Sequence, residues 1–142
     1  MTTVSELELL VKKLNLKTHF TGVRMKDELH DKPLEKECGI INLNDSDISS
    51  EENKKTGHWI AYFKDGDKKY HFCSYGSPPP IALIDYLGKP IYTHTFQLQS
   101  FNTGICGELS AMFLRMMDNH VDYFDVVLNL LSINNDDYGK AE

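Results

Sequence analysis

The sequence of 142 residues contains no long apolar run, only three cysteines and no excess of basic residues. A membrane-spanning helix needs about 20 consecutive apolar residues, and no run in this chain approaches that length. An odd, small number of cysteines does not make a disulfide framework and favours free thiols in a reducing compartment. The net charge of −6 argues against a broad basic surface for nucleic acid.

The chain also begins without the basic and apolar regions of a signal peptide, since it starts Met1-Thr2-Thr3-Val4-Ser5-Glu6. Its hydrophobic content of 41% and charged content of 25% are ordinary for a globular protein. A chain of this length can bury a core without a metal or disulfides. We therefore expect one soluble intracellular domain over residues 1–142, with a polar tail over about 134–142.

Apolar periodicity and turn residues predict the order of elements. A helix with a Ser5/Glu8 capping box opens the chain, and Asp65-Gly66 is a strong hairpin turn. The expected elements are a helix over Ser5–Leu14, a buried strand over Cys38–Leu43, a polar loop over Asn44–Thr56, hairpin strands over His58–Phe63 and Lys69–Ser74, a helix over Ile81–Leu87, a strand over Ile91–Leu98, and helices over Cys106–Met117 and Val121–Ile133. This order is typical of an α+β domain with a small, mostly antiparallel sheet.

Cys106 and His58 are the residues most suited to chemistry. Cys106 is predicted at the start of a helix, where unpaired N–H groups and the helix dipole favour a thiolate. His58 opens an apolar strand and offers an imidazole on a rigid backbone. A cysteine and a histidine far apart in sequence suggest a thiol nucleophile with its base. The alternative is that each is an ordinary structural residue, Cys106 packing as a small hydrophobe.

Gln99 is a third candidate, because it precedes Cys106 by seven residues in an expected loop. Its carboxamide N–H could join the backbone N–H of Cys106 in holding the oxyanion of a tetrahedral intermediate. The alternative is an exposed loop amide. Gln97 competes for the same role but falls within the expected strand.

Taken together, these positions resemble the adenovirus maturation protease family. The resemblance is closest to the short versions encoded by virophages, Polinton-like elements and large DNA viruses, whose catalytic core is shared with the SUMO-deconjugating proteases. It rests on His58-Trp59, on an aromatic-Gly turn after the second hairpin strand, and on Gln99-x3-Thr103-x2-Cys106-Gly107. The segments that carry it are Phe20–Leu29, Glu37–Leu43, Tyr75–Pro80 and Cys106–Leu114.

The resemblance implies a papain-like, adenain-like core in which the nucleophile-bearing helix packs on the sheet. Cys106 would attack the scissile carbonyl, His58 would act as base and then acid, and Gln99 would bind the oxyanion. Such a viral cysteine endopeptidase cuts capsid or other virion precursors at small or Gly-rich sites during maturation, in the host cytoplasm, viral factory and virion. It needs no cofactor or metal. Trp59 would either wall the cleft or be a core aromatic.

The family also implies partners. The substrate is a precursor polypeptide, and an activating peptide is a second partner that some members use. DNA also activates some members, but the acidic balance of this chain gives no support for it. Nothing in the sequence fixes an oligomeric state.

Cys73 occupies the position where the family has an acidic residue that orients the base. A thiol lacks the permanent charge of a carboxylate and is a weak hydrogen-bond acceptor. Ser74 should face the other side of the strand, and Asp65 and Asp67 belong to the distal turn. Cys73 therefore either completes a weakened triad or marks a slow or inactive enzyme.

Three other functions stay open. A SUMO- or ubiquitin-like deconjugase would use the same core on a folded modifier, and a pseudoprotease would act as a binding module in assembly. A metal site is least favoured, because His71 and Cys73 alternate on one strand without a motif to complete four ligands. The remaining candidates are expected to be structural or exposed: His19, His30, His71, His94, His120 and the core residue Cys38.

Overall fold

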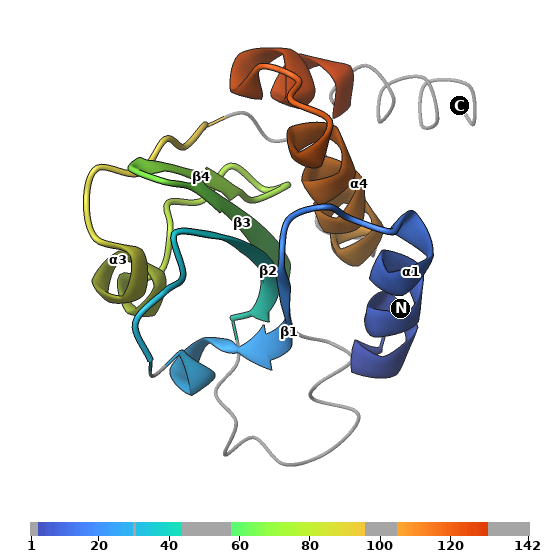
Figure 1. The fold of residues 1–142 in the computed structure, drawn as a ribbon, viewed down its shortest axis with the longest axis horizontal. Helices are drawn as coiled ribbons and strands as arrows, with labels where there is room; N and C mark the ends of the chain where they lie inside the picture. Colours follow the sequence, from blue (N-terminus) through green and yellow to red (C-terminus); the bar gives the residue numbers. More distant parts are fainter. Residues whose placement is uncertain (1–2, 30, 44–57, 96–104, 131–142) are drawn as a thin grey trace.

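A four-stranded sheet with helices on both faces forms the centre of the protein (Figure 1). The computed structural model describes residues 3–29, 31–43, 58–95 and 105–130. The elements are α1 (Val4–Leu14), β1 (Phe20–Met25), the 3₁₀ turn η1 (Lys26–Glu28), β2 (Lys36–Asn42), β3 (Trp59–Asp65), β4 (Lys68–Phe72), α3 (Ile81–Leu87) and α4 (Cys106–Asp118). Residues 123–130 are also helical. The fold is α+β.

The sheet is mixed and has the order β1-β2-β3-β4. β2 pairs antiparallel with β3, and β3 pairs antiparallel with β4, as the hairpin around Asp65-Gly66 requires. β1 pairs parallel with β2 and was not predicted as a strand. Gly22 has φ of 118°, and the register shifts between Phe20 and Val23, so the strand lacks a regular alternation. That bulge removes the period-2 signal by which a strand is recognised in sequence.

The core has two layers because β3 is central and covered on both faces. Trp59, Ala61 and Phe63 pack toward α1 and α4, whereas Ile60 and Tyr62 pack toward α3. Successive side chains of a strand point to opposite faces, which explains why all five are buried. Figure 1 shows α1 and α4 together on one side of the sheet and α3 on the other. Burial on both faces fixes the start of β3, next to His58.

The helix α3 has the predicted ends, whereas α1 has the predicted C-terminal end but a different N-cap. α3 ends at Gly88, whose φ of 80° is costly for other residues. α1 is capped by Thr3 rather than Ser5, with the Thr3 hydroxyl accepting from the Glu6 N–H and the Glu6 carboxylate accepting from the Thr3 N–H. The chain contains two overlapping Ser/Thr-x-x-Glu boxes, and the earlier one is used.

The expected strand over Ile91–Leu98 is wrong for residues 91–95. Backbone pairing there is a single bridge between Tyr70 and Tyr92. The next two residues approach β4 through side chains, since Thr93 Oγ1 lies 2.9 Å from His71 Nδ1 and His94 Nε2 accepts from the Cys73 N–H at 3.4 Å. The last helix starts at residue 123, later than Val121. The loop 44–56, residues 96–98 and 131–133, and the tail 134–142 lie outside the described residues.

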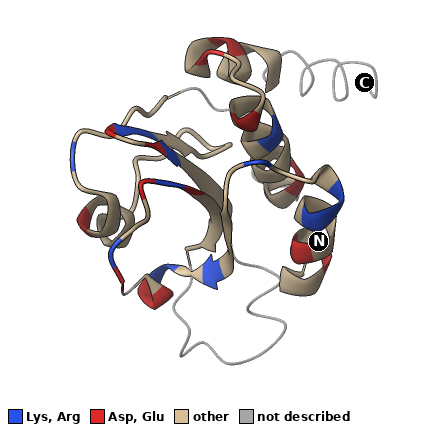
Figure 2. Ribbon diagram, viewed as in Figure 1, with Lys and Arg blue, Asp and Glu red and all other residues tan. Residues whose placement is uncertain are grey.

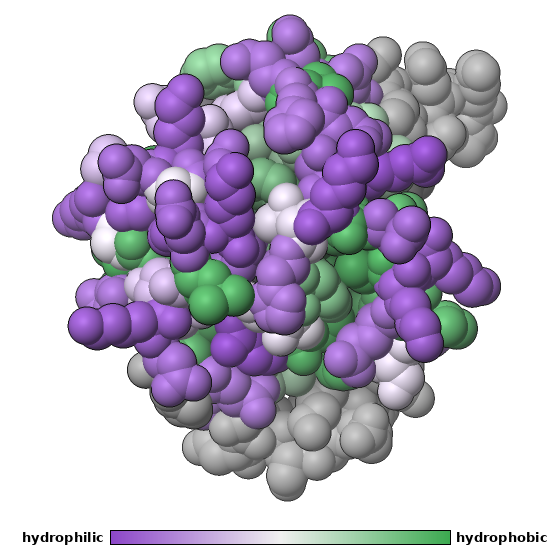
Figure 3. All heavy atoms as spheres, in the orientation of Figure 1, coloured by the Kyte–Doolittle hydropathy of each residue, from purple (hydrophilic) through white to green (hydrophobic). Residues whose placement is uncertain are grey.

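Acidic and basic residues are interspersed along the elements of the fold (Figure 2). Figure 2 shows Lys and Arg mixed with Asp and Glu on most elements rather than gathered on one face. Figure 3 shows polar side chains over most of the visible face, with smaller apolar areas between them. Among the described helices, none combines the length and the apolar character that crossing a membrane requires.

Candidate active site

Cys106 is the first residue of α4 and is held against the start of β3. The Trp59 N–H donates to Cys106 Sγ at 3.4 Å. One turn later, the Ser110 hydroxyl donates to the Trp59 carbonyl at 3.5 Å. Cys106 is 7% exposed. Two hydrogen bonds to one strand residue thus fix the nucleophile-bearing end of the helix beside His58, the neighbour of Trp59 in sequence.

Gly107 permits this close approach. A Cβ at Gly107 would lie 2.9 Å from Leu7 Cδ2 and 3.3 Å from Trp59 Cδ1. The glycine is buried, so its missing side chain leaves room for the core rather than for a substrate backbone. Trp59 is 1% exposed and is a core aromatic, not the wall of a cleft.

We expect Gly107→Ala to destabilise the fold by about 1–2 kcal/mol. Alanine stabilises a helix relative to glycine by up to about 1 kcal/mol. Overpacking a filled site destabilises the fold by about 1–3 kcal/mol. Urea unfolding measures the difference. In a Leu7→Ala background the same change should be less costly, because the clashing methyl groups are gone. A more stable Gly107→Ala variant would show that propensity outweighs packing.

His58 is held at its edge and on one face. Its Nε2 lies 3.1 Å from Cys73 Sγ. The Tyr75 ring stacks on the imidazole, with centroids 3.9 Å apart and planes 11° apart. Nδ1 is buried and has no hydrogen-bond partner within the part of the chain that the structure describes. The structure thus brings Cys73 to the base, and it adds Tyr75, which sequence reasoning named only as part of a turn.

Cys106 is connected to His58 through Trp59, which follows His58 in sequence and donates its N–H to Cys106 Sγ. Among the contacts of the described residues, Cys106 and His58 share no hydrogen bond. After burial, the Cys106 and Cys73 thiols are the causes that raise the pKa of Tyr75. Both thiols therefore act electrostatically on the ring that covers His58. Catalytic hydrogen bonds are often long in a substrate-free enzyme.

Burial determines the charge states of the pair. Burial raises the pKa of the Cys106 thiol, and the Glu108 carboxylate raises it further, against the N–H groups of Trp59, Gly107 and Cys106, which lower it. Burial lowers the pKa of His58 to about 4. The expected lowering at the helix start is present but smaller than desolvation. At neutral pH the resting pair is thus a neutral thiol and a neutral imidazole.

Asp65 and Glu37 do not supply a carboxylate at His58. Asp65 ends β3. Glu37 is buried and accepts from the hydroxyls of Tyr62 and Tyr86, but it pairs in register with Lys64. Six residues of strand separate Lys64 from His58, which is about 20 Å. Gln99, the candidate oxyanion donor, lies outside the described residues.

Two further imidazoles are buried near Cys73. His71 is 0% exposed and His94 is 5% exposed. Burial, with smaller contributions from His94 and His58, lowers the pKa of His71 to about 3. The exposed side chains of His19 and His120 lie elsewhere. His71 is therefore neutral in the folded protein.

We expect the free energy of unfolding to fall as the pH drops below about 6.5. The unfolded chain then binds protons that buried His71 does not, so each pH unit removes up to about 1.4 kcal/mol until its folded pKa is reached. His58 acts in the same direction, with less effect because it is partly exposed. Urea unfolding at pH 7, 6 and 5 measures the slope. His71→Asn should flatten it, while His19→Asn is the control; an unchanged slope in His71→Asn contradicts this account.

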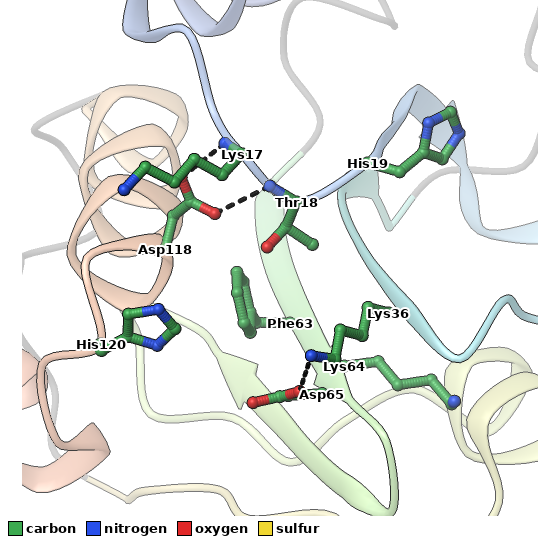
Figure 4. Close-up of a pocket in the computed structure, with 9 residues that line it drawn as sticks. All are labelled: Lys17, Thr18, His19, Lys36, Phe63, Lys64, Asp65, Asp118 and His120. Carbon is green, nitrogen blue, oxygen red and sulfur yellow. Dashed lines mark hydrogen bonds and ion pairs between the residues drawn. The ribbon is translucent and has the colours of Figure 1, made fainter.

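A cavity of about 400 Å³ lies at the other end of α4 (Figure 4). Asp118 accepts there from the N–H groups of Lys17 and Thr18 at 2.7 and 2.9 Å, and His120 and Phe63 line the same space. α4 places Asp118 about 18 Å from Cys106. The cavity is therefore separate from the candidate active site, and its carboxylate has a structural role in fixing the α1–β1 connection.

No family model and no curated protein matches the chain. Cys38, Cys73 and Cys106 are free thiols. Burial raises the pKa of Cys38 to about 12, as suits a core residue. Within the described ranges, no group of three or more His, Cys, Asp or Glu side chains could hold a metal ion.

Proposed function

We propose that the protein is a cysteine endopeptidase with an adenain-like core that cuts virion precursor polypeptides at small or Gly-rich sites. The observation that carries the proposal is the placement of His58. Its Nε2 is engaged by Cys73, its buried Nδ1 has no hydrogen-bond partner among the described residues, and the next residue binds the Cys106 sulfur. A base with one nitrogen anchored and the other unengaged beside a thiol has the arrangement that nucleophilic catalysis needs.

The reaction would proceed by proton transfer from the Cys106 thiol to His58 Nδ1 as sulfur attacks the scissile carbonyl. This requires the tautomer in which Nε2–H donates to Cys73 Sγ, so that Nδ1 carries the lone pair. Collapse of the tetrahedral intermediate breaks the C–N bond, and the imidazolium protonates the leaving amine. Water, deprotonated by His58, then hydrolyses the thioester and restores the thiol.

The N–H groups of Cys106 and Gly107 lie at the start of α4 and, with the Trp59 N–H, lower the pKa of the Cys106 thiol. The backbone N–H of Cys106 would stabilise the oxyanion, with Gln99 as a second donor. Since the resting pair is neutral, the thiolate would form during attack rather than before it. The imidazole would therefore act as a general base.

The direct test is a substrate panel read by mass spectrometry. Short Gly-rich peptides should be cut, whereas fusions of folded SUMO- or ubiquitin-like modifiers should not be. Release of a folded modifier without cleavage of short peptides would overturn the precursor-protease proposal and favour the deconjugase.

One observation favours a second candidate, the pseudoprotease. Burial raises the pKa of Cys106 and lowers the pKa of His58, which disfavours a thiolate–imidazolium ion pair. The residue at the imidazole edge is a thiol. A binding module in assembly would tolerate Cys106→Ala without loss of biological function. A protease would not.

A further inference from the structure

The turn that follows β4 is fixed at both ends. The Gly76 N–H donates to the Cys73 carbonyl at 2.9 Å and closes a β-turn over Cys73–Gly76. Gly76 has φ of 74°, a left-handed conformation that glycine adopts without a Cβ clash. At the other end, the Cys73 N–H donates to His94 Nε2. The positions of residues 73 and 75 are therefore set by backbone geometry.

This single turn contacts the His58 ring at its edge and on one face. Cys73 Sγ meets the edge at Nε2, and the Tyr75 ring covers the face at a centroid distance of 3.9 Å. An edge contact alone leaves the ring free to tilt about the Nε2···Sγ direction. A stacked face removes that freedom and holds Nδ1 in one direction.

The stack of Tyr75 on His58 also affects how well a positive charge on the imidazole is stabilised. Proton transfer from the Cys106 thiol makes His58 an imidazolium, and Cys73 is a weak acceptor with no fixed negative charge to stabilise it. The negative face of an aromatic ring attracts a cation, by about 1 kcal/mol at exposed sites and about 2 when desolvated. Tyr75 is the aromatic ring in face contact with His58.

We infer that Tyr75 is a positioning residue that fixes the His58 ring and stabilises its imidazolium, in part replacing the acidic residue that Cys73 displaces. The inference rests on the proposed function for its purpose, because the imidazolium arises only when Cys106 reacts. The ring, and not the hydroxyl, is the active feature. Tyr75→Phe should therefore rescue what Tyr75→Leu removes.

Two readouts on the full chain test this inference. The ¹⁵N shifts of the His58 ring report its tautomer. The pH profile of Cys106 alkylation by iodoacetamide reports how effectively His58 acts as a base toward Cys106. Wild type and Tyr75→Phe should show one Nε2–H tautomer and similar profiles. Tyr75→Leu should show averaged tautomer shifts and alkylation slower at pH 7 by about 5- to 30-fold. Tyr75→Met repeats the ring removal with a longer side chain, should the leucine variant not fold.

The matched control is Tyr92→Leu, which removes another stacked and partly exposed tyrosine, 5.3 Å from the Tyr70 ring. It should change neither readout. The inference is wrong if Tyr75→Leu and Tyr75→Met keep the wild-type tautomer and rate, if Tyr75→Phe loses as much as they do, or if Tyr92→Leu matches them. Failure of the proposed function is a separate result: the tautomer would still depend on Tyr75, but wild type would cut no peptide.

Discussion

Replacing Cys106 by alanine should abolish peptide cleavage, lowering kcat/KM by at least about 10³-fold. The side chain is nearly the same size, and the fold should persist because the Ser110–Trp59 hydrogen bond still holds α4 on β3. The loss would follow from the missing nucleophile, since no other described thiol lies at the start of a helix. Initial rates on the Gly-rich peptide that is cut fastest provide the measurement.

Cys38→Ala is the matched control for this prediction. Cys38 is also a buried free thiol, but it lies within β2 in the core. Its replacement should lower stability while leaving kcat/KM within a few-fold of wild type. Equal activity in Cys106→Ala and wild type would remove the protease proposal and leave the pseudoprotease.

Replacing Cys73 by aspartate should raise kcat/KM at pH 7 by about 10- to 100-fold. A carboxylate near His58 Nε2 would orient the ring and favour its charged form, and the pKa of His58 would rise from about 4. Losing such an acid costs about 10⁴ in a serine triad, and a thiol nucleophile needs less activation. Steady-state kinetics and NMR titration of His58 measure both effects.

The gain in activity should come with a loss of stability. Cys73 is fully buried, and a carboxylate there is desolvated and only partly compensated by the imidazolium. Cys73→Asn is the control, because it has the size and hydrogen-bonding oxygen of aspartate without its charge, and it should gain much less. A folded Cys73→Asp protein that is no faster than Cys73→Asn would show that charge at this position does not limit the reaction.

Local signals predicted much of the fold. Asp65-Gly66 between two alternating runs specifies the β3–β4 hairpin, and Pro80 with Gly88 specifies the ends of α3. β1 was missed because the Gly22 bulge interrupts its alternation. The strand expected after Pro90 was wrong, because Thr93 and His94 meet β4 through side chains, which a backbone-pairing pattern does not describe.

The candidate site was predictable in its residue types but not in its energetics. A helix-start cysteine can be read from sequence, whereas His58 was expected inside a strand and lies one residue before β3, which begins at Trp59. The Cys73 position follows from the family resemblance. The Tyr75 stack depends on a turn closed by Gly76, which brings residues 58 and 75 together. The pKa directions depend on burial by both core layers. That burial outweighs the helix-start effect on Cys106.

In the proposed reaction His58 acts as a base toward Cys106, and the pH dependence of Cys106 alkylation in wild type and His58→Ala measures whether it does. With iodoacetamide and peptide mapping, wild type should show a rate that rises between about pH 4 and 5, as His58 loses its proton, and stays level through pH 7. His58→Ala should lose this plateau and react only as the thiol itself ionises, which burial shifts to higher pH than for a free cysteine. If wild type lacks the plateau and the two profiles coincide, His58 is not the base for Cys106, and the proposed reaction is contradicted.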